Sequence, residues 1–314
     1  MKLQAICERF AAFRKTLGER FETNGRQLRA FCRAIGRNID IAEVSPEKVN
    51  AFLVGKGPLT TSWYVRHNAL LGFYRYAMSR GFVATSPLPL AIPKQPPAFQ
   101  PYIYTPAELR LILDSIGSCR RRRSHLDAPT MRSLVLLMYG AALRTSEALS
   151  LTIGDVDLHF RVLTIRDSKF FKTRLVPIGP KTLQMLSEYG SRRERCSGGP
   201  DAPFFVGLNA KPVAIYVFER AFQQIRLHAG LHRAGGPRYQ PRLHDLRHTS
   251  AVHRLTRWYR EGKDVQKLLP QLSVYMGHTL LAATQVYLTM TPELLHQASL
   301  RFERYATSEC GNDY

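Results

Sequence analysis

Six residues in the later part of the chain are of the types that attack on a phosphodiester requires. They are Arg144, Lys169, His244, Arg247, His278 and Tyr287. The segment RLHDLRHTSAVHRL places His244, Arg247 and His248 at positions i, i+3 and i+4 of a predicted helix, so the three side chains share one face. In GHTLLAATQVYLTM, Tyr287 follows His278 by nine residues. The set predicts chemistry on a phosphate.

Two arginines and a tyrosine are suited to the central steps of this reaction, the stabilisation of charge and the attack on phosphorus. Attack on a phosphodiester builds negative charge on the nonbridging oxygens, and Arg144 and Arg247 are suited to hold it because each can bind two oxygens. A tyrosine hydroxyl, whose pKa in water is about 10, becomes a nucleophile if another group accepts its proton. We expect Tyr287 to be that nucleophile and His244 to be the proton acceptor.

The leaving oxygen and the phosphate need further partners. A deoxyribose oxygen must be protonated as it departs, and a lysine on a flexible hairpin, Lys169, could deliver that proton. His278 would add a hydrogen bond to the phosphate. A tyrosine ester retains the energy of the broken bond, so a free DNA hydroxyl could reverse the step. The sequence therefore predicts a reaction without a cofactor, a nucleotide or a metal site.

Each of these residues, taken alone, also has an ordinary structural explanation. An arginine near a helix end often caps carbonyl groups, an HxxRH face is often a solvated basic stripe, and many hairpin lysines have no role. Most tyrosines are packed core residues. The phosphoryl-transfer interpretation depends on the six types occurring together in one basic domain.

The elements that must position these residues are mostly helical. Residues 102–314 show helical patterns at 104–116 and 128–158, the latter interrupted near Gly140 and resumed after Arg144, and again from 212 onward. Short β patterns lie at 160–167, 173–179 and 202–207, and the first two flank the turn SKFFK. We expect a mainly α fold with a small antiparallel β-sheet, of the α+β class.

A proline-rich segment divides the chain. Residues 1–88 read as four helices, at 3–17, 25–36, 45–57 and 60–82. Six prolines lie between Pro87 and Pro101, where no helix can continue, and residues 89–101 are predicted to form a semi-rigid linker. The predicted domains are a helical DNA-binding domain at 1–88 and a catalytic domain at 102–314.

The charge of the chain favours nucleic acid as its partner. Against 24 acidic residues stand 45 Lys and Arg, a formal charge of +21 over 314 residues, and 45% hydrophobic residues exclude a disordered basic tail. Residues 1–98 hold 15 Lys and Arg and 6 Asp and Glu, so both domains are basic, as in a clamp on DNA. An anionic membrane surface is the second choice. Candidate DNA contacts are Arg66, Arg75, Arg120, Arg121, Arg122, Arg123, Lys172 and Arg174.

The remaining composition points to the cytoplasm. No apolar run reaches the roughly 18 residues of a spanning helix, and charge interrupts the N-terminus too early for a secretory signal, so no membrane partner is expected. The five cysteines are scattered, without CxxC or Cys/His spacing, and we expect reduced thiols rather than disulfides or zinc ligands.

The sequence resembles the tyrosine recombinases, also called phage integrases. GAALRTSEALSLTIGDVDL resembles the family's first arginine box around Arg144, with Glu147 and Asp155 in supporting positions. SKFFKTRLVPIG resembles the hairpin whose first lysine, Lys169, is catalytic, and HDLRHTSA resembles the HxxR box. YMGHTLLAATQVYLTMTPELL resembles the closing box, in which Tyr287 matches the nucleophile. Four ordered boxes make a specific match over the second domain, whereas the first domain matches in length and pattern only.

The resemblance implies a reaction and an assembly. It implies DNA cleavage through a 3′-phosphotyrosyl link, a Holliday-junction intermediate, and a homo-tetramer or hetero-tetramer on double-stranded DNA with inverted half-sites. The amphipathic segment TPELLHQASLRFERYA would pack on a neighbouring protomer. The long segment between Arg247 and His278 is similar to that of recombinases carried by transposons and other mobile elements, which predicts integration, excision or transposition. The four consecutive arginines from Arg120 would contact the DNA backbone or be solvated.

Two alternatives remain open. A type IB topoisomerase uses the same residue types to relax supercoils without exchanging partners, although the separate helical domain and compact hairpin favour a recombinase. A catalytically silent DNA-binding accessory protein of a mobile element would keep the fold and lose the chemistry. The presence of all six expected residue types argues against the silent protein.

Overall fold

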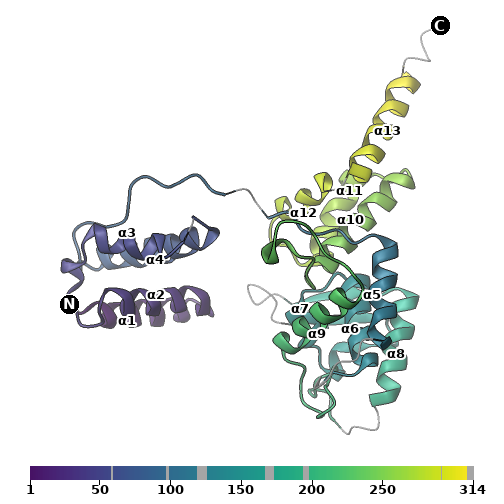
Figure 1. Ribbon diagram of the computed structural model, residues 1–314, viewed down its shortest axis with the longest axis horizontal. Helices are drawn as coiled ribbons and strands as arrows, with labels where there is room; N and C mark the ends of the chain where they lie inside the picture. Colours follow the sequence, from purple (N-terminus) through teal and green to yellow (C-terminus); the bar gives the residue numbers. More distant parts are fainter. Residues whose placement is uncertain are drawn as a thin grey trace. The chain divides into compact units, whose positions relative to one another are not determined.

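The protein consists of two compact units, Met1–Phe99 and Gln100–Tyr314 (Figure 1). The computed structural model describes residues 1–57, 59–96, 99–118, 126–166, 173–193, 198–290 and 292–309. Within this described part, no helix is both long and apolar enough to cross a membrane.

The first unit is helical, as its sequence predicts. Its helices are α1 (Leu3–Thr16), α2 (Glu22–Ile35), α3 (Pro46–Val54) and α4 (Thr61–Ser79), with a short 3₁₀ turn η1 (Ile41–Glu43). The predicted start of α3 is confirmed: the Ser45 hydroxyl accepts a hydrogen bond from the Lys48 backbone N–H at 3.5 Å, and Pro46 occupies the first turn. Aromatic side chains of α1, α2 and α4, among them Phe10, Phe31 and Phe73, fill the core.

The helices of the second unit surround one small sheet. They are α5 (Pro106–Ser118), α6 (Ala128–Gly140), α7 (Thr145–Leu149), α8 (Pro180–Arg193), α9 (Ile215–His228), α10 (Asp245–Arg260), α11 (Val265–Met276), α12 (Ala282–Gln285) and α13 (Pro292–Glu309), with 3₁₀ turns η2 (Ile153–Asp155), η3 (Pro237–Tyr239) and η4 (Val286–Thr289). The predicted break near Gly140 is confirmed as the end of α6, and α7 begins after Arg144.

The sheet has three antiparallel strands in the order β1-β2-β3, namely β1 (Val156–Asp157), β2 (Val162–Ile165) and β3 (Arg174–Pro177). Strands β2 and β3 form the predicted hairpin, in register from Val162 opposite Pro177 to Ile165 opposite Arg174. The predicted mainly α fold with a small antiparallel sheet is confirmed.

The strand predicted at 202–207 is wrong. That segment makes only isolated bridges, between Thr152 and Pro203 and between Val206 and Pro212. The first bridge is made by the Phe204 N–H bonding the Leu151 carbonyl at 2.7 Å and the Ile153 N–H bonding the Ala202 carbonyl at 2.9 Å. It is not extended into a ladder: Pro203 has no N–H to donate, and the Val206 N–H donates to the Tyr189 hydroxyl at 3.3 Å. The third strand is β1, whose two residues are too few to show alternation in the sequence.

Helix α13 leaves the body of the second unit. Figure 1 shows it extending away from the other helices of this unit. Its first turns are held: Leu294 is buried, Glu293 pairs with Arg260, and Arg301 donates to the Lys263 carbonyl. Phe302, farther along, is 72% exposed, so apolar surface lies uncovered on the projecting part.

Candidate active site

One buried carboxylate organises the cations of the site. Glu147, on α7, accepts hydrogen bonds from Nη1 and Nη2 of Arg174 at 2.9 and 2.8 Å and from Nη1 of Arg144 at 2.6 Å. Nη1 of Arg247 lies 3.8 Å from the same carboxylate. Burial alone would raise the pKa of Glu147, but the hydrogen bonds from Arg174 and Arg144 outweigh it and bring the pKa to about 2. Three guanidiniums around one carboxylate leave a surplus of positive charge for an anion.

Arg247 is fixed by the backbone of two other segments. Its side chain is almost fully buried, and it donates to the carbonyls of Ala142 and Met276, each at 2.6 Å. Burial and the neighbouring charge of Arg144 lower the pKa of Arg247 to about 10, so the guanidinium stays protonated at neutral pH. Ala142 adopts a φ of 50°, a left-handed conformation that is costly outside glycine. Local strain therefore accompanies the break between α6 and α7 where the site is built.

Arg144 ties α7 to the end of α11. Its Nη2 donates to the Gly277 carbonyl at 2.8 Å, and its backbone N–H donates to Glu147 at 2.9 Å. Gly277 has a φ of 68° and ends α11, and a Cβ there would lie 2.7 Å from Nη1 of Arg174. The glycine thus allows both the left-handed turn and the close approach of the guanidinium.

Tyr287 lies in η4 with its hydroxyl facing α10. Its side chain is only 2% exposed, and the hydroxyl is 3.0 Å from Nδ1 of His248. Burial raises the pKa of Tyr287, although the positive charges of Arg247 and Arg144 act against this effect. The phenol is therefore protonated in the unbound protein and close to cations that would stabilise its anion.

Two imidazoles lie beside this phenol, and a third packs on one of them. The rings of His248 and His278 lie 5.6 and 6.1 Å from the Tyr287 ring, and the His244 ring packs edge-on against His248 at 5.0 Å. Burial, with nearby positive charge, lowers the pKa of His244, that of His248 to about 3 and that of His278 to about 4. Nδ1 of His278 is engaged with the Thr284 hydroxyl at 2.8 Å. All three rings are neutral at pH 7.

The structure brings together five of the six candidate catalytic residues: Arg144, His244, Arg247, His278 and Tyr287. The sixth, Lys169, lies outside the described residues, as do Lys172 and the run Arg120, Arg121, Arg122 and Arg123.

Two of the predicted DNA contacts have partners within the chain. Arg174 is paired with Glu147, and 9% of its side chain is exposed. Arg66 donates to the carbonyls of Phe52 and Leu53, each at 3.1 Å, and so caps the end of α3. Arg75 is exposed on α4.

Sequence reasoning missed the pairing of Tyr287 with His248. It placed His248 on the correct helix face but gave the proton-accepting role to His244. Among the described residues, no hydrogen bond joins His244 to Tyr287. Because both histidines are on the same face, spacing alone does not tell which one meets η4.

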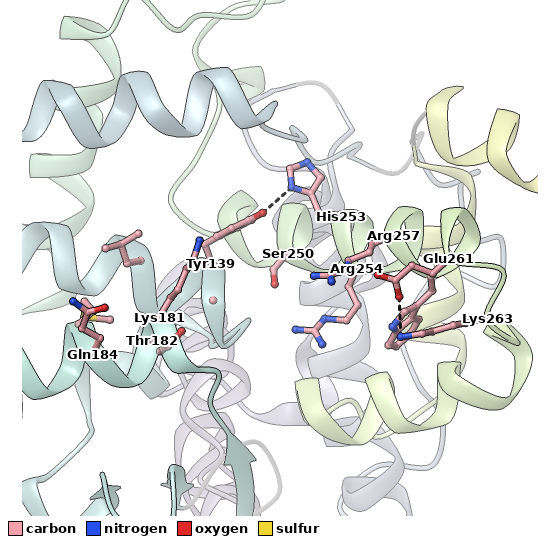
Figure 2. Close-up of a pocket in the computed structure, with 14 residues that line it drawn as sticks. Tyr139, Lys181, Thr182, Gln184, Ser250, His253, Arg254, Arg257, Glu261 and Lys263 are labelled. Carbon is pink, nitrogen blue, oxygen red and sulfur yellow. Dashed lines mark hydrogen bonds and ion pairs between the residues drawn. The ribbon is translucent and has the colours of Figure 1, made fainter.

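A large cavity lies elsewhere on the second unit. It has a volume of about 920 Å³ and is lined by side chains of α6, α8 and α10, including Tyr139, Lys181 and Arg257 (Figure 2). The Tyr139 hydroxyl lies 2.9 Å from Nδ1 of His253 at its edge. None of the five candidate catalytic residues that the structure describes lines it. Within the part of the chain that the structure describes, no three His, Cys, Asp or Glu side chains cluster as metal ligands.

Comparisons with a family model and with related proteins indicate the same family. The model of the phage integrase family matches residues 106–293. The protein y4rB of Sinorhizobium fredii, whose name describes an integrase/recombinase, is 33% identical over 306 residues, 96% of each chain. Tyrosine recombinase XerD of Mycobacterium leprae is 29% identical over 284 residues, 82% of each chain.

Solved structures share the fold. The Tn1549 transposon integrase in complex with transposon right end DNA matches with a TM-score of 0.70 and 17% identity, over 98% of this chain and 100% of that one. A lambda integrase tetramer bound to a Holliday junction matches with a TM-score of 0.65 and 17% identity, over 90% and 77% of the respective chains. The chain belongs to the phage integrase family, the tyrosine recombinases, and is a site-specific DNA recombinase.

Proposed function

We propose that this recombinase cleaves DNA with Tyr287 and rejoins it by reversing the same step. One observation carries the proposal: the buried hydroxyl of Tyr287 lies beside Arg247, within a cluster where the positive charge of three arginines exceeds the charge of Glu147. A scissile phosphate would supply the missing negative charge.

The reaction would exchange one phosphate ester for another. The phenol oxygen of Tyr287 attacks phosphorus while its proton passes to a base, the role that we assign to His244, the bond from phosphorus to the 5′ oxygen breaks, and the 3′ phosphate remains on the tyrosine. Arg144 and Arg247 hold the nonbridging oxygens, and Lys169 protonates the departing 5′ oxygen. A free 5′ hydroxyl then attacks the phosphotyrosine and restores the DNA backbone. Energy is conserved in the ester, so no external energy source is consumed.

The remaining charged residues would prepare the phosphate pocket. Glu147 holds Arg144 and Arg174 in place, and the backbone carbonyls of Ala142 and Met276 hold Arg247. His278, neutral and oriented by Thr284, is placed to donate a hydrogen bond to the phosphate through its other ring nitrogen. Catalytic side chains held in this way need little reorganisation when DNA arrives.

The assembly would be a tetramer on double-stranded DNA with inverted half-sites, formed by one kind of protomer or by two. The Holliday-junction complex of lambda integrase supports a tetramer, and the DNA complex of the Tn1549 integrase supports a role in the movement of a mobile element. The exposed apolar residues of α13, such as Phe302, would pack on a neighbouring protomer. The basic helical unit Met1–Phe99 would bind DNA together with the catalytic unit.

A covalent-capture experiment tests the proposal. The full chain is incubated with nicked duplexes tiled across the DNA that flanks its own gene, and products are separated under denaturing conditions. We expect a protein–DNA adduct with the wild type and none with Tyr287→Phe. Tyr216→Phe, at a tyrosine that is 72% exposed, is the control and should form the adduct normally. An adduct that persists in Tyr287→Phe, or wild type that forms none on any duplex, would contradict the proposal.

A further inference from the structure

We propose that His248 is the positioning residue of the nucleophile: its Nδ1 holds the hydroxyl of Tyr287 and so fixes the direction of the attacking oxygen. This inference rests on the proposed role of Tyr287. It concerns a histidine outside the set of six residues that the sequence singled out, and it gives that histidine a task distinct from binding the phosphate.

The hydrogen bond between the two residues is the first support. Nδ1 of His248 is 3.0 Å from the Tyr287 hydroxyl, and the rings are inclined by 54°, so the contact runs through the nitrogen rather than through stacked faces. The Tyr287 side chain is 2% exposed, so water has little access to replace this partner. The His278 ring is stacked on the phenol ring with centroids 6.1 Å apart, and its own Nδ1 is occupied by Thr284.

The surroundings of His248 fit a neutral hydrogen-bond acceptor. Burial lowers its pKa to about 3, assisted by the neighbouring His244 and the charge of Arg247. At neutral pH the ring therefore has a free lone pair, and Nδ1 can accept the phenol proton in a hydrogen bond. A nitrogen of such low basicity would not remove a proton from a phenol whose own pKa is raised by burial. His248 is suited to orient the hydroxyl rather than to deprotonate it.

His248 is held in a fixed position by its helix, which explains why its contact with Tyr287 can be precise. His248 directly follows Arg247 on α10, and Arg247 is locked to the carbonyls of Ala142 and Met276. Tyr287 lies instead in η4, a 3₁₀ turn of only four residues, and hydrogen-bond geometry is generally poorer in such a turn than in an α-helix. The hydrogen bond between Tyr287 and His248 thus fixes the position of the nucleophile relative to α10, the same helix that carries the phosphate-binding Arg247.

Three substitutions separate positioning from the other roles. In His248→Asn, the side-chain carbonyl oxygen branches at the same carbon as Nδ1 and can accept the bond, but it cannot take up a proton. In His248→Gln the polar group lies one carbon farther out, and in His248→Leu it is absent. The rate of single-turnover cleavage is measured at saturating concentrations of the duplex that forms the covalent adduct with the wild type. DNA affinity is measured in parallel by gel shift.

We expect His248→Asn to cleave within about threefold of the wild-type rate, and His248→Leu and His248→Gln to cleave about 100-fold more slowly at unchanged DNA affinity. Failure of all three variants, with rescue when Tyr287 is replaced by a more acidic fluorotyrosine, would overturn the proposal in favour of a proton-accepting role. Wild-type rates in His248→Leu would also overturn it. Wild type and Tyr287→Phe are measured in the same experiment as controls. If wild type forms no adduct, the result counts against the proposed function itself. If wild type forms the adduct normally, a result that contradicts the expected rates counts only against the proposed role of His248.

Discussion

Glu147 shows how one buried carboxylate can hold a cluster of arginines in place. It neutralises part of the charge of Arg174 and Arg144, and it lies near Arg247. The site therefore combines a net positive field with defined guanidinium positions. Removing the carboxylate leaves buried cations that repel one another, which is costlier than the loss of an exposed ion pair.

Substitution of Glu147 by glutamine tests this account. At pH 7 we expect Glu147→Gln to lower the free energy of unfolding by roughly 3–5 kcal/mol, because a buried charge cluster loses its counterion while its volume is kept. Urea unfolding measures the change. The control is Glu188→Gln, at an exposed carboxylate bonded to Gln184, with an expected change within about 0.5 kcal/mol. Equal effects of the two substitutions would contradict the account.

The same carboxylate also predicts a pH dependence. Its pKa is about 2 in the folded protein against an ordinary value of 4.5, and a carboxyl with a lowered pKa stabilises the fold above its unfolded pKa. That contribution is lost as the pH falls from about 4.5 to about 2. The difference in unfolding free energy between wild type and Glu147→Gln should therefore narrow over this interval and stay constant above it. A difference that widens on acidification would refute the assigned direction.

Residue types and spacing predicted which residues lie in the site better than they predicted which of these residues contact one another. Arg144, Arg247 and Tyr287 were identifiable because phosphoryl transfer needs their functional groups. The partner of Tyr287 was not, because it depends on how η4 meets α10 across a separation of 39 residues. Arg174 was expected to contact DNA, and its pairing with Glu147 depends on a contact between residues 27 positions apart in the chain, which spacing does not reveal.

Among the elements, helices were predictable and the sheet only in part. Periods of three to four residues and capping signals extend over many positions in α1 to α4, so several residues agree on each helix. A two-residue strand such as β1 has no such redundancy, and the apolar run around Phe204 resembles a strand although it forms only isolated bridges. The end of α11 is a further case in which local geometry matters, because a single glycine meets two requirements there.

Gly277 and Gly262 form a matched pair that separates these two requirements. Both have a φ of 68°, but a Cβ at Gly262 meets no atom within 4 Å, whereas at Gly277 it meets the Arg174 guanidinium. We expect Gly262→Ala to cost about 1 kcal/mol from backbone strain alone. Gly277→Ala should cost more and also slow DNA cleavage, because Arg174 must leave Glu147 or Tyr275. Thermal unfolding and adduct formation measure the two effects, and identical behaviour of the variants would refute the role of the close approach.

The molecule as a whole is two basic units, each with its own core. The buried cluster around Phe10, Phe31 and Phe73 lies entirely within Met1–Phe99, and those around Leu134 and Leu255 lie entirely within Gln100–Tyr314. Independent cores predict independent folding. Residues 1–98 carry 15 basic and 6 acidic residues of the chain's 45 and 24, so each unit also keeps a positive surplus when separated.

Division of the chain between residues 99 and 100 tests this organisation. Each fragment should unfold cooperatively by circular dichroism, because no core is cut. Each should bind duplex DNA more weakly than the full chain, by roughly 100-fold or more, since joining two binding units makes the second contact intramolecular. The affinity of the full chain should fall more steeply with salt than that of either fragment, because both units displace counterions from the same duplex. A catalytic fragment that binds as tightly as the full chain, with the same salt slope, would show that the first unit contributes no DNA contact.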